Sequence, residues 1–154
     1  MLIRAGAHYL DLIGRARKSY YHALEPVCRK WDLTHNALDI VLFLYNNPEY
    51  DRAADIVSRR GIAKSHVSLS VMGLERRGLL TRGLCGEDRR TAHLKLTQDA
   101  ATIAREGREA QERFFAALYQ GISETELEQW RHMMEKMRAN MEQIERDAAQ
   151  KRSD

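Results

Sequence analysis

The sequence predicts a mainly α-helical fold with one small β-hairpin, arranged as a winged helix-turn-helix lobe that carries long terminal helices. Three observations support this prediction. Only 7% of the 154 residues are aromatic and two are proline, a composition that suits long helices better than many strands. Two short helical segments flank a glycine-containing turn at residues 61–63. Two strand-like segments then follow, at residues 79–84 and 91–96.

The N-terminal segment, residues 2–30, has apolar residues at spacings close to multiples of a helical turn. These positions are Ile3, Leu10, Ile13, Tyr20, Leu24 and Val27. Pro26 predicts a late break or kink, because proline lacks an N–H group and crowds the preceding turn.

A second helix is expected over residues 37–45, with Thr34 as its N-cap. Asn46-Asn47-Pro48 is a strong stop signal. A buried strand is an alternative for Ile40–Tyr45, but the length of the segment and the Thr34 cap favour a helix.

The helix pair is predicted at residues 52–60 and 64–77, ended by Gly61 and Gly78 respectively. Its inward residues follow helical spacing and are Ile56, Val57, Val67, Val71 and Leu74. Residues 85–90 are polar and charged, as expected for the tip of the hairpin that forms the wing.

Two more helices are expected after the hairpin. Thr97 is the predicted cap of the first, and Gly121 its predicted end. The pair Ser123 and Glu126 has the spacing of a capping box, which begins the final helix. Apolar positions in these helices are Ile103, Ala104, Phe114, Phe115, Leu118, Ile122, Leu127, Trp130, Met134, Met137, Met141 and Ile144.

We interpret residues 1–154 as a single domain in which residues 1–30 and 98–150 form dimerisation helices and residues 34–97 form the lobe. The terminal apolar stripes are too long to be used up by a small central unit, so the sequence predicts a homodimer. The alternative is that these stripes form only an intramolecular core.

Charge is distributed unevenly along the chain. The net charge is +3 in total, but residues 52–97 carry +6 and the remainder −3. A basic centre between acidic arms indicates a unit that binds a polyanion. The alternative is a solvated surface with an accidental surplus of cations.

In a helix-turn-helix, the second helix enters the major groove of DNA and presents outward side chains near its N-terminus. The expected DNA contacts on this helix are Lys64, Ser65, His66, Ser68 and Leu69. Leu69 can pack on thymine methyl groups. Arg89 and Arg90 at the hairpin tip are expected to enter the minor groove, with Asp88 orienting the wing. A merely solvated helix face is the alternative.

Four segments together resemble the MarR family of bacterial transcriptional regulators: residues 61–68, 74–80, 87–90 and 94–97. Asp88 and Arg90 match the Asp-x-Arg wing motif of that family. The resemblance implies a homodimer with interleaved terminal helices that binds a pseudo-palindromic double-stranded DNA operator. It also implies repression that is relieved by a small ligand, often phenolic, or by oxidation.

The sequence departs from the family pattern at three positions. Ala63 replaces a serine that commonly caps the second helix of the pair. Leu69 stands where a basic or polar residue is frequent, and Gly73 lies inside the helix. These differences leave the fold prediction unchanged and affect the operator sequence that the chain would recognise.

The resemblance places a possible small phenolic or other aromatic effector where the terminal helices meet the lobe. The candidate ligand residues are His8, Tyr20, Trp31, His35 and Tyr45, which are alternatively plain core residues. Cys85 is a redox candidate because Arg82, Arg89 and Arg90 would lower the pKa of its thiol. The alternative for Cys85 is an incidental thiol.

Other classes of function receive little support. The histidines and cysteines have no metal-ligand spacing, and we find neither a nucleophile motif nor a phosphate-binding loop. We therefore expect no enzyme, no metal and no cofactor. The longest apolar run, at residues 40–45, is too short to cross a membrane, and no secretory signal is visible, so a cytoplasmic protein is expected. The alternative function is a winged-helix protein–protein adaptor without specific DNA binding.

Overall fold

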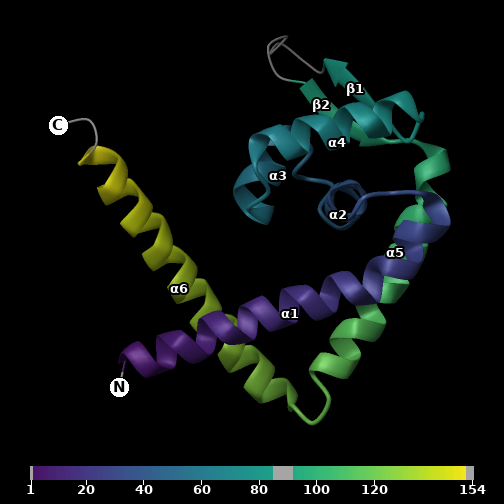
Figure 1. The fold of residues 1–154 in the computed structure, drawn as a ribbon. Coiled ribbons are helices and arrows are strands. Elements are labelled where there is room, and N and C mark those ends of the chain that lie inside the picture. The colour runs from purple at the N-terminus through teal and green to yellow at the C-terminus, as the bar shows by residue number, and fades with distance from the viewer. Residues whose placement is uncertain (1, 85–91, 152–154) are drawn as a thin grey trace. The chain divides into compact units, whose positions relative to one another are not determined.

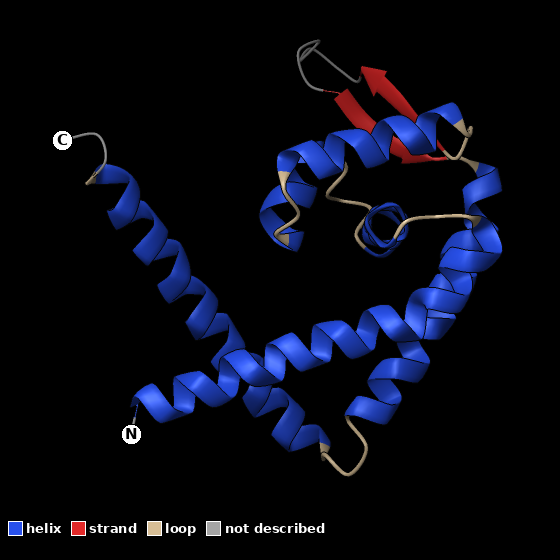
Figure 2. Cartoon of the chain, in the orientation of Figure 1, coloured by secondary structure: helices blue, strands red, loops and turns tan. Residues whose placement is uncertain are grey.

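The computed structural model describes residues 2–84 and 92–151 of the chain. Over these residues the chain forms six helices and one antiparallel hairpin, arranged as Figures 1 and 2 show. In chain order the elements are α1 (Leu2–Trp31), α2 (His35–Asn46), α3 (Ala53–Arg60), α4 (Lys64–Arg76), β1 (Leu80–Leu84), β2 (Ala92–Leu96), α5 (Gln98–Leu118) and α6 (Glu124–Gln150). The predicted fold class, mainly helical with a small hairpin, is confirmed.

The chain divides into two compact units, Met1–Phe115 and Ala116–Asp154. The first unit contains the hydrophobic core, and α2 lies at its centre. Figure 1 shows α2 end-on, with α4 on one side and α1 on the other. Every residue of α2 from Ala37 to Leu44 is buried. A helix that is apolar on nearly all sides must be covered by other elements, and this explains the position of α2.

The close contact between α5 and α2 depends on a glycine. A Cβ atom built at Gly107 would lie 2.8 Å from Cδ2 of Leu42, whose side chain is fully buried. The absence of a side chain at position 107 therefore allows the two helices to approach each other in the core.

Most of the predicted helix boundaries are confirmed. The hydroxyl of Thr34 accepts a hydrogen bond from the backbone N–H of Ala37 at 3.1 Å, and α2 ends at Asn46. Gly61 and Gly78 follow α3 and α4 with left-handed φ angles of 63° and 67°. These angles disfavour a side chain, so glycine allows the chain to turn sharply at both points.

Two predicted interruptions differ from the structure. Of the predicted break or kink at Pro26, the break is wrong, because α1 continues through this residue to Trp31. Proline leaves the carbonyl of His22, one helical turn earlier, without its usual donor, but His22 is exposed and water can replace the donor. The second difference concerns the end of α5. The sequence predicts that this helix ends at Gly121, but it ends at Leu118, three residues earlier.

In the second unit, α6 begins with the predicted capping box. Ser123 Oγ accepts a hydrogen bond from the N–H of Glu126, and the Glu126 carboxylate accepts one from the N–H of Ser123 at 2.8 Å. The rings of Tyr119 and Trp130 are 6.2 Å apart and connect the turn to the helix. Among the helices that the structure describes, none is both long and apolar enough to span a membrane.

Candidate nucleic-acid interface

Helices α3 and α4 form a helix-turn-helix around a short turn. Ile62, within this turn, is buried and anchors it to the core. On α4, the predicted stripe of Val67, Val71 and Leu74 is also buried. The opposite side of α4 is therefore free to contact another molecule.

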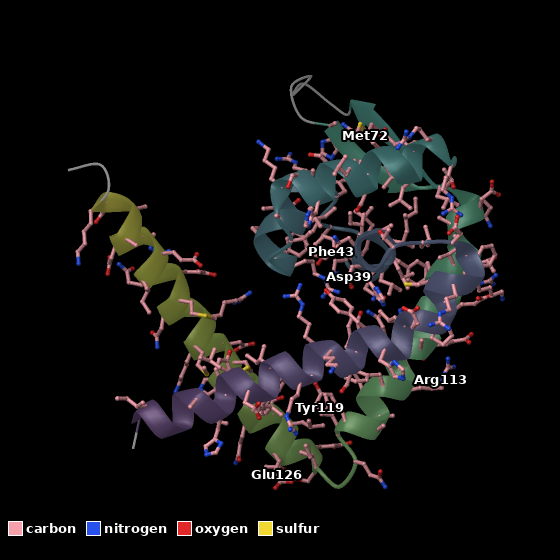
Figure 3. All side chains as sticks on the ribbon, in the orientation of Figure 1. Asp39, Phe43, Met72, Arg113, Tyr119 and Glu126 are labelled. Atoms are coloured by element: carbon pink, nitrogen blue, oxygen red, sulfur yellow. The ribbon has the colours of Figure 1, made fainter. Side chains whose placement is uncertain are left out.

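All five residues of α4 that the sequence predicts to face DNA are exposed. They are Lys64, Ser65, His66, Ser68 and Leu69. Sequence reasoning missed Met72, which is 46% exposed and follows Leu69 by three residues. Figure 3 labels Met72 on α4. The helical spacing of Leu69 and Met72 was a signal for this placement.

The first turn of α4 is suited to an anion. Its N-cap residue, Ala63, makes no side-chain hydrogen bond to the helix, as expected from the sequence. The first turn contains no acidic residue, and Lys64 lies in it. Because the N-terminus of a helix carries a partial positive charge, this end of α4 can accept a phosphate of a DNA backbone.

The hairpin is attached to the helix pair by polar contacts. Asp51, just before α3, binds β2 twice: its carbonyl accepts from the N–H of Leu94 at 2.7 Å, and its carboxylate pairs with His93 Nδ1 at 2.7 Å. Arg82 on β1 pairs with Glu75 on α4 at 2.9 Å. These contacts fix the described part of the hairpin against α3 and α4.

The predicted wing-tip residues lie outside the described residues. They are Asp88, Arg89, Arg90 and the redox candidate Cys85. Their proposed roles remain predictions. The redox prediction for Cys85 relied in part on the positive charge of Arg82. That premise is weakened, because the guanidinium of Arg82 is already paired with the carboxylate of Glu75.

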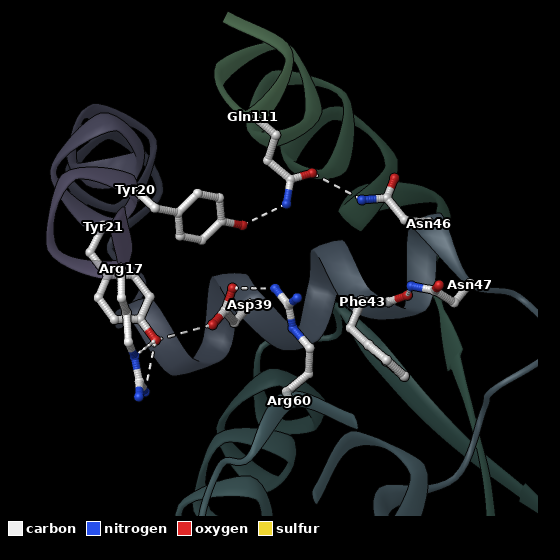
Figure 4. Close-up of polar contacts among 9 residues, drawn as sticks. All are labelled: Arg17, Tyr20, Tyr21, Asp39, Phe43, Asn46, Asn47, Arg60 and Gln111. Atoms are coloured by element: carbon white, nitrogen blue, oxygen red, sulfur yellow. Dashed lines mark hydrogen bonds and ion pairs between the residues drawn. The ribbon is translucent and has the colours of Figure 1, made fainter. Parts of the chain in front are cut away.

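A buried carboxylate in α2 links three helices. The side chain of Asp39 is only 5% exposed and pairs with Arg60 Nη2 at 2.9 Å, at the end of α3 (Figure 4). Tyr21 on α1 donates its hydroxyl to the same carboxylate at 3.4 Å and accepts a hydrogen bond from Arg17. We call Asp39, Arg60, Tyr21 and Arg17 the Asp39 network.

Electrostatics favours the charged form of Arg60 within the Asp39 network. Burial is the largest single influence on this guanidinium and lowers its pKa. The carboxylate of Asp39 and the hydroxyl of Tyr20 together outweigh burial, so the pKa of Arg60 is raised. The sequence contained a signal for this network, because Asp39 interrupts the otherwise apolar run of α2. It did not identify Arg60 as the partner.

A second polar chain connects α1, α5 and α2. Gln111 on α5 donates to the Tyr20 hydroxyl at 2.6 Å and accepts from Asn46 Nδ2 at 2.9 Å (Figure 4). The Tyr20 ring also packs edge-on against Phe114 at 5.5 Å. Burial raises the pKa of Tyr20, so the hydroxyl stays protonated and remains a hydrogen-bond partner.

The structure brings together two of the five candidate effector residues. Tyr20 and His35 both lie beside Tyr21, with ring centroids 5.8 and 5.0 Å from it. His35 Nε2 lies 3.0 Å from the backbone carbonyl oxygen of Tyr21 and 3.2 Å from the carboxylate of Glu25. The vicinity of Tyr21 is therefore the place where an aromatic ligand would meet both candidates.

The other three candidates lie apart from this vicinity or are otherwise engaged. Trp31 donates its indole N–H to Glu106 at 2.9 Å, and a hydrogen bond from Lys30 lowers the pKa of that carboxyl. His8 is exposed and precedes Tyr20 by about 18 Å along α1. Tyr45 is exposed near the end of α2.

Cys28 is buried in the core, and burial raises the pKa of its thiol to about 11. At pH 8 only about one thiol in a thousand would be ionised, and the thiolate is the reactive form. We predict that, in a Cys85→Ser variant, iodoacetamide alkylates Cys28 on the order of 100 times more slowly in the native than in the denaturant-unfolded protein. Mass spectrometry over time measures the two rates, and equal rates would contradict the prediction.

The chain is similar to known proteins in both sequence and structure. A family model described as the MarR family matches residues 31–91, which include α2, α3, α4 and β1. A MarR-family transcriptional regulator from Silicibacter pomeroyi is similar in structure, with a TM-score of 0.73 and 20% identity over 84% of this chain and 86% of that one.

Two further solved structures were determined as complexes. The S. aureus MepR–DNA complex matches with a TM-score of 0.70 and 19% identity over 88% of this chain and 95% of that one. NadR in complex with 4-hydroxyphenylacetate matches with a TM-score of 0.71 and 20% identity over 83% of this chain and 89% of that one. The chain has the fold of MarR-family transcriptional regulators.

Proposed function

We propose that this chain, whose residues 31–91 match a family model described as the MarR family, is a homodimeric, sequence-specific DNA-binding regulator that acts as a repressor until a small ligand releases it. The observation that carries the proposal is the exposed face of α4, where Lys64, Ser65, His66 and Ser68 lie opposite the buried stripe. Hydroxyls, an imidazole and an ammonium group can hydrogen-bond base edges and phosphates in a major groove. Binding rather than catalysis is therefore the proposed activity.

We assign residues 1–30 and 98–150 to dimerisation and residues 34–97 to the DNA-binding lobe. Helix α6 supports this division, because none of its described residues is buried in the single chain although it carries Trp130, Met133, Met141 and Ile144. In α1, Ile3, Leu10 and Leu12 are likewise exposed. Apolar surface of this extent suits an interface with a second copy.

A dimer would present two copies of α4 to the same DNA duplex. Two recognition helices related by a two-fold axis bind half-sites about 34 Å apart, one helical turn of DNA. The operator is therefore proposed to be pseudo-palindromic. One copy of the chain supplies only one α4 and one wing.

For ligand release, we propose a small aromatic effector that carries a phenol or a carboxylate and binds beside Tyr20, Tyr21 and His35. NadR was solved with 4-hydroxyphenylacetate, a molecule of this class. The Asp39 network supports the assignment, since it joins α1 to the last residue of α3. An effector anion that competed with Asp39 for Arg60 would disturb the helix pair directly.

The function is tested by selecting tight-binding duplexes from a randomised DNA library and measuring their affinity by fluorescence anisotropy. The proposal expects one enriched, inverted-repeat sequence that binds with two chains per duplex. Enrichment of no sequence, with affinity independent of sequence, would favour the adaptor alternative. The enriched duplex is then the probe for the variants below.

We predict that Arg90→Ala weakens binding to the selected duplex about tenfold or more, because the wing arginine is proposed to enter the minor groove. Arg113→Ala is the matched control, since Arg113 is an exposed arginine on α5, outside the lobe (Figure 3). Both variants should unfold at the temperature of the parent protein. Unchanged affinity of the Arg90 variant would exclude wing insertion.

A further inference from the structure

Helix α4 carries an apolar pair at the centre of its exposed face. At about 100° per residue, Ser65, Leu69, Met72 and Arg76 fall within about 60° of one another around the helix axis. The buried residues Val67, Val71 and Leu74 lie on the opposite side. Leu69 is 61% exposed and Met72 46% exposed.

This exposure is unusual within the lobe. In the described parts of residues 34–97, the large hydrophobic side chains that are exposed are Tyr45, Leu69 and Met72. The other exposed large hydrophobic residues lie in α1, near the end of α5, or in the second unit. Within these described parts of the lobe, Leu69 and Met72 are therefore the exposed large aliphatic and thioether side chains, and they are neighbours on one helix face.

The surroundings of the pair identify the partner that fits it. Lys64 and Arg76, both exposed, lie at the two ends of α4, and Ser65 and Ser68 lie beside the pair. A basic and hydroxyl-rich rim is complementary to phosphates and base edges rather than to an apolar protein surface. In the major groove of DNA, the apolar group available to such side chains is the C5-methyl group of thymine.

The distance between Leu69 and Met72 along α4 is close to the distance between adjacent base pairs along DNA. Residues three apart are displaced by about 4.5 Å along a helix, and successive base pairs by about 3.4 Å along DNA. The unbranched thioether of Met72 can adjust to the remaining difference. One side chain can then cover each of two neighbouring methyl groups.

We propose that Leu69 and Met72 read two neighbouring thymine methyl groups in each operator half-site. This inference rests on the proposed DNA-binding function and specifies what part of α4 recognises. It predicts that each half-site contains two adjacent A·T or T·A pairs whose methyl groups face α4.

The test replaces thymine by deoxyuridine, one position at a time, in the duplex selected from the randomised library. This replacement removes the methyl group and keeps the base-pairing edge. At two adjacent positions in each half-site, affinity should fall about three- to fivefold per methyl group removed. In a Leu69→Ala/Met72→Ala variant, the thymine and deoxyuridine duplexes should bind equally well.

Ser65→Ala is the matched control on the same helix face. It should lower affinity for both duplexes without changing the ratio between them, because the Ser65 hydroxyl is proposed to hydrogen-bond the DNA and not to cover a methyl group. Since Leu69 and Met72 are exposed, their truncation leaves the core intact, and circular dichroism checks that the variants are folded.

The outcomes separate the inference from the function on which it rests. Tight binding that is insensitive to deoxyuridine at every position would overturn the inference and leave the proposed function standing. A methyl dependence that persists in the double variant would overturn it as well, by assigning the methyl contacts to other residues. If no duplex is bound with sequence preference, the proposed function fails, and the inference with it.

Discussion

Affinity for the selected operator duplex should fall by about a thousandfold or more when salt is raised from about 50 to 200 mM. The reason is the +6 charge of residues 52–97, which would release cations condensed on the DNA. A dimer that neutralises about six phosphates, three per lobe, gives a fall of this size. Fluorescence anisotropy across a salt series measures it.

The structure limits which cations contribute to this effect. Arg60 and Arg82 are paired with Asp39 and Glu75 within the protein, whereas Lys64 is exposed and forms no described ion pair. Lys64→Ala should therefore reduce the slope of log affinity against log salt by about one per lobe. Arg113→Ala, on α5, should leave the slope unchanged. A flat salt dependence in the parent protein would contradict DNA binding through the basic lobe.

Replacing Asp39 by asparagine should lower the free energy of unfolding by about 2–3 kcal/mol. The variant leaves the Arg60 cation without its counter-ion and offers Tyr21 a weaker acceptor. The side chain of Arg60 is 33% exposed, so water compensates part of the loss, and we expect a smaller effect than the roughly 3–5 kcal/mol of a broken, fully buried pair. Urea denaturation followed by circular dichroism measures the change.

Asp11→Asn is the matched control for this prediction. Asp11 pairs with Arg15 at 3.5 Å, but the two side chains are 71% and 81% exposed, so its removal should change stability by less than about 0.5 kcal/mol. A double-mutant cycle of Asp39→Asn with Arg60→Met should give a coupling energy of about 1 kcal/mol or more. A loss for Asp39→Asn no larger than for Asp11→Asn would show that the network does not stabilise the fold.

The elements of the fold were largely predictable because their signals are local. The Thr34 cap, the turn at Gly61 and the capping box of Ser123 and Glu126 each act over at most four residues. Periodicity likewise identified Val67, Val71 and Leu74 as buried. The predicted break failed at Pro26, where exposure of His22 allows water to replace the missing N–H donor and the helix to continue.

The candidate site was predictable in part. The outward residues of α4 follow from the buried stripe on its other side, and the same geometry implied that Met72 is exposed. The grouping of Tyr20 and His35 around Tyr21 required the structure, since residues on α1 and α2 meet there only through packing. Nothing in the spacing of the five candidate effector residues indicated that His8, Trp31 and Tyr45 would lie elsewhere.

By itself, the sequence determined that the chain is a helix-turn-helix with a hairpin, carried on long amphipathic helices and basic at its centre. Periods, caps and turn residues encode these features within short stretches of chain. Only the tertiary structure decided the partner of Asp39. The Asp39–Arg60 pair joins residues 21 positions apart on two helices, and the cost of burying a carboxylate is met only when packing brings a cation to it.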